Sequence, residues 1–330
     1  MIETLRNPLS LRRAALRQSY IFALLLLLIA IGVMFALNPN FFRPAILNGN
    51  LRTYLPLMLL AAGQTIVVIA GGIDLSVGAI VSLVNVVTVV LLGTAPSAGQ
   101  IVLAIVAGLA AGAAAGAFNG ICVAYLRFQP IVTTFASSFL IGGLALFIMP
   151  TPGGSVPAGL MDAYRANPLW IPLTLWIGAV VLLVWQIVRS TRFGGYIYAV
   201  GGQPLAAYAS GVPVARVRLA SYTISGLMAG LAGCAFALGT GTGDPLIGLS
   251  TSQPITLSAV VAVVLGGTRL SGGQGGVAGS LIGVLVLGLI RNIISFANVP
   301  TWWQTLVDSL IVMFALAGPG VAALVRRRRL

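Results

Sequence analysis

The chain of 330 residues is 58% hydrophobic and only 7% charged, and its mean hydropathy is +1.05. These values exclude a soluble globular protein, because too few polar residues are present to cover its surface. The chain has no histidine and no lysine, which excludes an imidazole base, a histidine-ligated metal and the lysine of a phosphate-binding loop. We therefore expect a membrane protein that is not an enzyme, binds no metal and has no ATPase site of its own.

The net charge of +13 indicates membrane topology rather than nucleic-acid binding. All 18 basic residues are arginines, and eight of them lie within residues 1–19 and 326–330. Because positively charged segments stay in the cytoplasm, both termini are expected there. No nucleic-acid partner is expected.

Apolar runs close to the roughly 20 residues that cross a bilayer predict an all-α, polytopic transmembrane helical bundle. Two cytoplasmic ends require an even number of spans, and residues 1–330 are expected to form one domain. The connections 150–168 and 239–245 are predicted at the outer face. The ten predicted spans lie near residues 20–37, 53–70, 75–93, 100–125, 131–149, 170–188, 219–238, 254–267, 276–297 and 302–325.

The polar, glycine-rich stretch 71–78 interrupts these runs and recurs 195 residues later at 266–273. Both copies share the frame Gly-Gly-x-(charged)-Leu-Ser-x-Gly, with Asp74 in the first copy and Arg269 in the second. The recurrence predicts an internal repeat.

Two structures are possible around Asp74. In one, Gly71 and Gly72 break a helix within the membrane, and the freed backbone groups line a water-filled path. In the other, Asp74 is the N-cap of a helix at a tight cytoplasmic turn and never meets a solute.

Polar side chains within the spans suit hydrogen bonding to a polyol, although hydrogen bonding between helices is their commoner use. The scarcity of charges in the spans argues against coupling to protons or ions. An uncharged solute moved by energy from elsewhere fits better. The candidate pathway residues are Gln64, Asp74, Ser76, Asn85 and Asn119.

The fourth span carries a glycine at every fourth position, so these glycines share nearly one helix face. Without side chains, this face allows another helix to approach closely. The predicted packing glycines are Gly108, Gly112, Gly116 and Gly120.

The longest predicted cytoplasmic connection, 190–218, contains a short helix. Gln203 is expected to cap this helix, Pro204 to begin it and Gly211 to end it, after a flexible Gly201-Gly202 pair. A short rigid helix suits docking on a partner, and the lack of basic residues between Arg192 and Arg216 argues against the alternative of a helix lying on lipid. The candidate coupling residues are Gly201, Gly202, Gln203, Pro204, Leu205, Ala206, Ala207, Tyr208, Ser210 and Gly211.

From the residues alone, two readings without an ATPase stay open. One is a secondary transporter or channel for a small uncharged solute, and the other is a structural or receptor-like membrane protein.

Three motifs in order resemble the permease subunits of bacterial monosaccharide ABC importers, the branch of the ribose, xylose, arabinose and galactose permeases. The resemblance covers about residues 50–315. The motifs are 71–78, 263–273, and a connection with Thr191-Arg192-Phe193-Gly194, Ala199-Val200-Gly201-Gly202 and Ser210-Gly211-Val212.

This resemblance implies a permease domain in the bacterial inner membrane that passes a sugar or sugar-like polyol. The helix near 204–210 would be the coupling helix. The partners implied are a cytoplasmic ATPase that binds ATP and Mg, a periplasmic solute-binding protein, and a second copy of the permease or a related one.

Two positions depart from the family pattern. Thr256-Leu257-Ser258 stands where the family often has Glu-Leu-Asp, and Gln203 stands where Asn is common. The two missing acids leave open a heterodimer in which a sibling permease keeps them. Related nucleoside and signalling-sugar importers share this sequence style, so the residues do not specify the solute.

Overall fold

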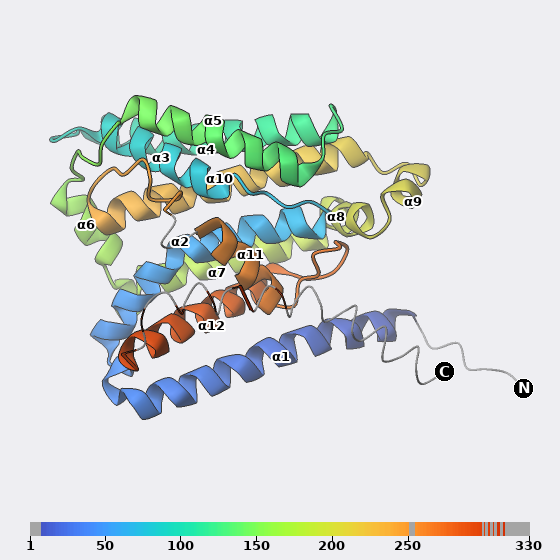
Figure 1. Cartoon of the computed structure of the whole chain (residues 1–330), viewed down its shortest axis with the longest axis horizontal. Helices are drawn as coiled ribbons and strands as arrows, with labels where there is room; N and C mark the ends of the chain where they lie inside the picture. Colours follow the sequence, from blue (N-terminus) through green and yellow to red (C-terminus); the bar gives the residue numbers. More distant parts are fainter. Residues whose placement is uncertain are drawn as a thin grey trace, which may run out of the picture.

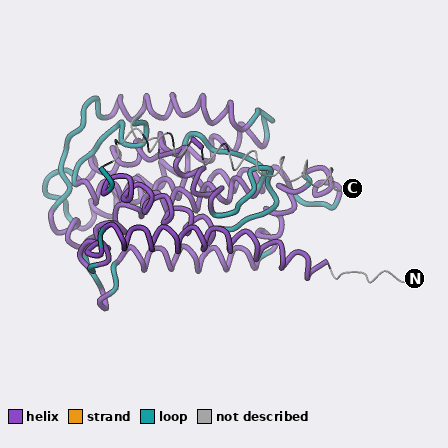
Figure 2. The backbone as a smooth tube through the Cα atoms, turned by 60° about the horizontal axis from the view of Figure 1, so that its bottom comes forward, coloured by secondary structure: helices purple, strands orange, loops and turns teal. Residues whose placement is uncertain are grey.

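The computed structural model describes residues 8–250, 255–298 and 300, together with the single positions 303, 306, 309, 310 and 313. Within this part the chain is helical, and Figure 2 shows helices joined by loops. The elements in chain order are α1 (Pro8–Leu37), η1 (Pro39–Phe42), α2 (Pro44–Ile69), α3 (Val77–Leu92), α4 (Ala98–Ala124), α5 (Pro130–Ile148), α6 (Ala158–Arg165), η2 (Pro168–Trp170), α7 (Leu173–Ser190), α8 (Arg192–Gly202), α9 (Pro204–Ala209), α10 (Val214–Thr240), α11 (Ile255–Leu265) and α12 (Val277–Phe296).

Six described helices are long and apolar enough to cross a membrane, namely α2, α4, α5, α7, α10 and α12. Three shorter apolar helices are Phe22–Leu37 within α1, α3 and α11. Each of these nine helices lies on one of the first nine predicted spans, so the all-α membrane fold is confirmed. The tenth predicted span, 302–325, and the basic tail, 326–330, lie outside the described residues apart from the single positions given above.

Proline and capping residues set several helix starts. Pro44, Pro130 and Pro204 each lie in the first turn of a helix, where the missing N–H leaves no hydrogen bond unmade. At the start of α4, the Ser97 hydroxyl accepts from the Gln100 N–H (3.3 Å), and the Gln100 side chain accepts from the Ser97 N–H (2.8 Å). This reciprocal capping box satisfies two amides that have no partner within the helix.

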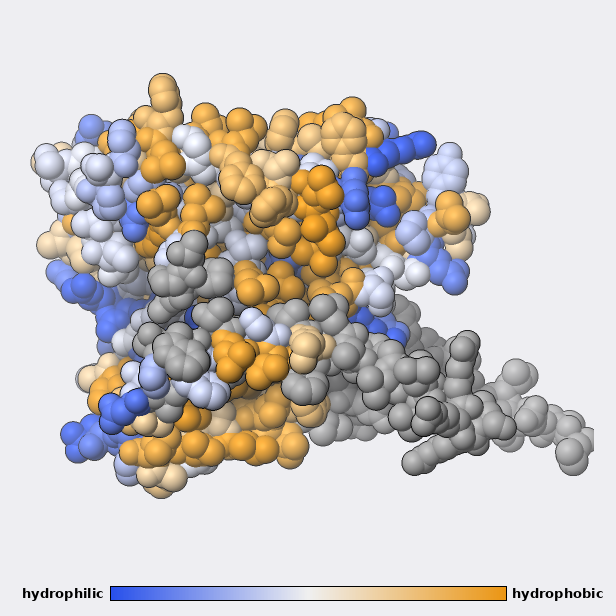
Figure 3. Space-filling model, in the orientation of Figure 1, coloured by the Kyte–Doolittle hydropathy of each residue, from blue (hydrophilic) through white to orange (hydrophobic). Residues whose placement is uncertain are grey.

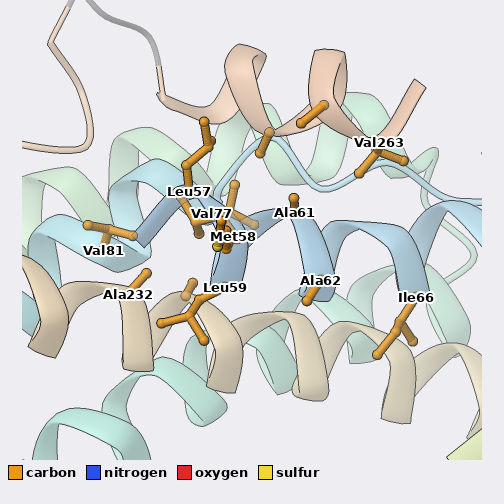
Figure 4. Packing of buried hydrophobic residues seen from close by; sticks show 14 of the residues in the cluster. Leu57, Met58, Leu59, Ala61, Ala62, Ile66, Val77, Val81, Ala232 and Val263 are labelled. Atoms are coloured by element: carbon orange, nitrogen blue, oxygen red, sulfur yellow. The ribbon is translucent and has the colours of Figure 1, made fainter. Parts of the chain in front are cut away.

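Helices α2 and α10 form the centre of the bundle. α10 packs against α2, α3 and α4, while α5 covers α3, and α12 packs against α1, α2 and α11. Figure 1 shows the long helices side by side, with α1 at one edge and α4 and α5 at the other. Every residue of α2 from Leu55 to Ile69 is buried. Figure 4 shows Leu57 and Ile66 of this helix among side chains of its neighbours, such as Ala232 of α10 and Val263 of α11.

The outer helices expose large apolar side chains that a water-soluble protein would bury. Leu28 of α1 is 66% exposed, Phe147 of α5 is 84% exposed and Leu183 of α7 is 61% exposed. Figure 3 shows apolar residues over the middle of the bundle and hydrophilic residues gathered towards its two ends. This distribution is that of a surface in contact with lipid.

The bundle has two ends that differ in their connections (Figure 1). α8 and α9 lie at one end, which we call the α9 end. α6 lies at the other, the α6 end, within the connection 150–168. There Gly153 and Gly243 exchange two backbone hydrogen bonds of 2.9 and 2.8 Å, so the connections 150–168 and 239–245 lie together.

Candidate functional site

Close approach of α4 to α10 depends on glycine. A Cβ added to Gly112 would lie 2.7 Å from the Gly226 carbonyl oxygen, and one added to Gly116 would lie 2.9 Å from Gly226 Cα. Both distances are too short for a side chain. The four glycines of the predicted face contact two helices: Gly112, Gly116 and Gly120 lie against α10, and Gly108 lies against Thr88 and Val84 of α3.

The helices that lead into the two copies of the repeat, α2 and α11, end in the same way. Gly71 and Gly267 have φ of +84° and +81°, the left-handed conformation that glycine adopts without a steric penalty. The N–H of Gly71 donates to the carbonyl of Val68 (3.0 Å), and the N–H of Gly267 donates to that of Val264 (2.9 Å). The N–H of the following residue donates to the carbonyl one residue earlier, from Gly72 to Val67 in the first copy and from Thr268 to Val263 in the second. This second hydrogen bond completes a Schellman motif at each helix end.

The equivalent positions are therefore Gly71 and Gly267, one residue away from the alignment of Gly71 with Gly266 that the shared frame predicts. Asp74 and Arg269 are consequently not structural counterparts. Asp74 is fully buried, whereas Arg269 is exposed in a longer turn at the α9 end.

After the first turn, residues 73–76 run back into the bundle beside α2. The Gln64 amide, in the orientation that satisfies both of its polar atoms, donates to the Asp74 carbonyl oxygen (3.1 Å) and accepts from the Asp74 N–H (3.2 Å). Gln64 precedes the end of α2 at Ile69 by five residues, or about 8 Å of helix. Asp74 therefore lies within the membrane-spanning bundle rather than at a surface turn.

The Asp74 carboxylate is the centre of a buried hydrogen-bond network. One oxygen accepts from the Ser76 N–H (2.9 Å) and hydroxyl (2.6 Å), and the other accepts from the Ser225 hydroxyl of α10 (3.3 Å). Asn119 of α4 donates to the Ser76 hydroxyl oxygen (2.7 Å). Four of the five candidate pathway residues thus meet here, each with none of its surface exposed. Their hydrogen bonds join α2, α4 and α10 to the start of α3.

Asn85, the fifth candidate, lies apart from this network on α3. Its side-chain oxygen accepts from the Asp244 N–H (2.7 Å), and the Ser82 hydroxyl accepts from the Gly248 N–H (3.0 Å). These bonds attach residues 244–248 to α3 at the α6 end.

Main-chain contacts hold α8 against both copies of the repeat. Gly201 lies against the carbonyl group of Ile69, and a Cβ added to Gly201 would lie 2.8 Å from the Gly273 nitrogen. The Gly273 N–H donates to the Ile69 carbonyl oxygen (2.9 Å). We call the contacts among Ile69, Gly201 and Gly273 the α8 junction. Gly201 is buried in it, so this glycine is a packed position and not the flexible joint that the sequence predicts.

A side-chain hydrogen bond adds to the α8 junction. The Tyr198 hydroxyl of α8 donates to the carbonyl oxygen of Gly275, two residues after the second copy of the repeat (2.8 Å).

Helix α9 extends from the α9 end of the bundle (Figure 1). Leu205 is 86% exposed and Tyr208 is 74% exposed, whereas Ala207 is buried. Gln203 occupies the N-cap position, but its side chain makes no capping hydrogen bond. The other candidate coupling residues continue the same segment: Gly202 ends α8, Pro204 and Ala206 lie in α9, the Ser210 hydroxyl donates to the Ala206 carbonyl (2.9 Å), and Gly211 follows with φ of +79°.

The α6 end contains a cavity of about 1110 Å³ between α2, α12 and the connection 244–250, which sequence reasoning missed. None of the five candidate pathway residues lines it, although Asn85 holds Asp244 at its edge. A signal was present in the sequence. Asn50 and Tyr54, like Gly288 and Asn292, are four residues apart, which places each pair on one helix face.

Comparison with known proteins identifies the class to which this geometry belongs. Residues 46–316 match the family described as the permease component of the branched-chain amino acid transport system. The chain belongs to this family, and the resemblance to importer permeases is confirmed. It is thus a multi-pass membrane permease of the bacterial ABC importers and not an enzyme, since a separate ATPase hydrolyses ATP in these systems.

Curated relatives align along most of the chain. The ribose import permease protein RbsC of Bacillus subtilis (strain 168) is 36% identical, covering 88% of this chain and 89% of its own length. RbsC of Escherichia coli (strain K12) is 34% identical, covering 89% and 91%. The L-arabinose ABC transporter permease protein AraH of Azospirillum brasilense is 31% identical, covering 84% and 80%. No solved structure matches the chain significantly.

Proposed function

We propose that this chain forms the translocation path of an ATP-driven importer for a monosaccharide or sugar-like polyol. Relatives at 30–36% identity include permeases named for ribose, L-arabinose, galactose and fructose. A periplasmic binding protein delivers the solute, and the ATP and Mg that drive the cycle bind to the partner ATPase. A second copy of this chain, or a related permease, completes the membrane core.

The proposed topology has ten spans in the inner membrane, with the α9 end and both termini in the cytoplasm. Arginines support it, because they concentrate on the cytoplasmic side of membrane proteins. Arg127, Arg189, Arg192, Arg216, Arg218 and Arg269 lie in connections or helix termini at the α9 end, and the eight terminal arginines add to them. Arg43, Arg52, Arg165 and Arg291 belong to the α6 end.

The observation that carries the proposal is the exposure of Leu205 and Tyr208 on a short helix whose base is fixed by the α8 junction. Two large apolar side chains exposed to water beyond a membrane surface favour burial in a partner. A groove of the ATPase provides that burial. Because α8 contacts both copies of the repeat, a force on α9 reaches the segments that begin α3 and α12.

Co-purification tests this proposal. The tagged chain is expected to isolate with a stoichiometric cytoplasmic ATPase in mild detergent, and Leu205→Glu with Tyr208→Ser is expected to abolish that association and sugar uptake. Ser190→Ala is the matched control, since the exposed Ser190 hydroxyl donates to the Ile187 carbonyl within its own turn of α7 (2.7 Å). Isolation of the wild-type chain without any ATPase, even after cross-linking, would overturn the proposal in favour of a secondary transporter.

A further inference from the structure

We infer that the cavity between α2, α12 and the connection 244–250 is a binding site for a neutral, polyhydroxylated solute within the permease. This inference rests on the proposed function and specifies where in the chain the sugar is held.

The cavity is a cup that opens at the α6 end. Along α2 its lining runs from Asn50 to Leu57, and along α12 from Ser295 to Gly288. Each stretch is eight residues long and rises about 10 Å along its helix, so the two walls of the cavity have the same depth. Beyond Leu57 every residue of α2 is buried, and a hydrogen bond between Thr65 and Ser280 (2.6 Å) joins α2 to α12 below the cup. The structure is thus closed towards the α9 end.

A neutral hydrogen-bonding cluster crosses the cavity wall from α2 to α12. The Asn292 amide nitrogen donates to the Tyr54 hydroxyl and to the Asn50 side-chain oxygen (3.3 Å). Amides and hydroxyls both donate and accept, so they match the hydroxyl groups of a sugar. Apolar residues such as Leu57 and Leu249 complete the lining, as is usual in small-molecule sites, where a few polar groups orient the ligand.

The two charged residues at the cavity have opposite signs, and each makes a hydrogen bond to a neutral group of the permease. The Arg291 guanidinium donates to the Ser258 hydroxyl of α11 (2.6 Å), and an Asp244 carboxylate oxygen accepts from the Leu246 N–H (2.8 Å). Together they add no net charge. A lining without net charge favours neither cations nor anions, and a neutral polyol avoids the desolvation cost that an ion would pay on entering it.

Close packing fixes the cluster in place. A Cβ at Gly288 would lie within 2.5–2.8 Å of three ring atoms of Tyr54, so glycine at this position lets the Tyr54 ring lie against α12. Across the cavity, Asn85 and Ser82 hold the segment from Asp244 to Gly248 by hydrogen bonds. A preorganised site of this kind loses little entropy when a ligand binds.

Transport kinetics of the complete importer provide the first test. Membrane vesicles with the ATPase and binding protein take up labelled D-ribose, and Asn292→Ala and Asn50→Leu are each expected to raise KM about 3- to 10-fold, as loss of one or two hydrogen bonds predicts. Asn48→Leu is the matched control. It changes the same residue type two positions away in α2, outside the cavity lining, and is expected to leave KM unchanged.

Protection from a thiol reagent provides a second test that does not depend on a folding defect. Cys122 and Cys234 are buried, so a membrane-impermeant maleimide reports on an introduced cysteine. With the binding protein present, ribose is expected to slow labelling of Ser295→Cys, in the cavity, at least threefold and to leave Thr94→Cys, in the connection between α3 and α4, unaffected.

Two results would overturn the inference while the proposed function stands. One is ribose uptake by the wild-type importer with equal labelling of Ser295→Cys in the presence and absence of the sugar, and the other is protection by leucine in place of ribose. By contrast, an assembled complex that hydrolyses ATP but takes up none of ribose, arabinose, galactose and fructose would contradict the proposed function itself.

Discussion

Gly201 of α8 lies directly against the carbonyl group of Ile69, the last residue of α2, and no side chain fits between them. The same carbonyl oxygen accepts a hydrogen bond from the Gly273 N–H (2.9 Å). One carbonyl group at the end of α2, just before the first copy of the repeat, therefore contacts both the second copy and the segment that leads to α9.

Substitution of Gly201 tests whether this contact matters. Gly201→Ala is expected to lower stability in detergent by about 1–3 kcal/mol, the usual cost of forcing extra atoms into a packed site, and to reduce uptake. Gly202→Ala is the control, because a Cβ at Gly202 meets nothing within 4 Å. Thermal unfolding and transport assays measure both effects. Equal behaviour of the two variants would show that the junction tolerates a side chain.

Replacement of Asp74 separates the hydrogen-bonding role of this residue from its charge. Asp74→Asn is expected to fold, because an amide oxygen can still accept from the Ser76 N–H and hydroxyl. Asp74→Ala leaves these buried donors without a partner and is expected to lower the free energy of unfolding by about 1–3 kcal/mol for each unsatisfied donor. Fluorescence-detected gel filtration after a heat step compares the yields.

Asp162→Ala, on the exposed face of α6, is the control for the Asp74 variants and is expected to match the wild type. A heat-stable Asp74→Ala protein would show that the network does not hold the start of α3.

The contact between α4 and α10 predicts a cost for even one methyl group. A Cβ on Gly116 would lie 2.9 and 3.0 Å from backbone atoms of Gly226, and two helix backbones cannot separate without losing packing along their length. We expect Gly116→Ala to lower the midpoint of thermal unfolding. Gly143→Ala, on a face of α5 with nothing within 4 Å, is expected to keep or raise it, since alanine favours helix over glycine. The prediction fails if Gly116→Ala unfolds at or above the midpoint of Gly143→Ala.

Sequence reasoning located the membrane-spanning helices because their signals are local. Long apolar runs, prolines in first turns and glycines after last turns all act within a few residues. The glycine spacing of α4 is local in the same sense. The short helix from Pro204 was predicted from its own breakers, and α9 ends at Ala209.

The path of residues 73–76 could not be predicted in this way. The Schellman motif at Gly71 ends α2 but does not set the direction of the following chain. That direction depends on hydrogen bonds to side chains of three helices: Gln64 of α2 bonds to Asp74, Asn119 of α4 donates to Ser76, and the Leu75 N–H donates to the Thr134 hydroxyl of α5 (3.0 Å). Each is a tertiary contact that one sequence alone does not specify.

The cavity was missed for a related reason. Its lining comes from three stretches far apart in the chain, near 50–57, 244–250 and 288–295, and each stretch by itself resembles the polar end of a transmembrane helix. Only the packing of α2 against α12 brings Asn50 and Tyr54 to Asn292. The sequence pointed instead to five polar residues in or next to the spans, and four of these are hydrogen-bonded to one another around Asp74.

The α8 junction consists of main-chain atoms, which have no rotamers and cannot adapt as side chains do. A small displacement of α8 must therefore move the end of α2, and with it the carbonyl group that holds the second copy of the repeat. If the partner ATPase pulls on α9, both copies of the repeat are displaced in the same step, so neither copy moves alone.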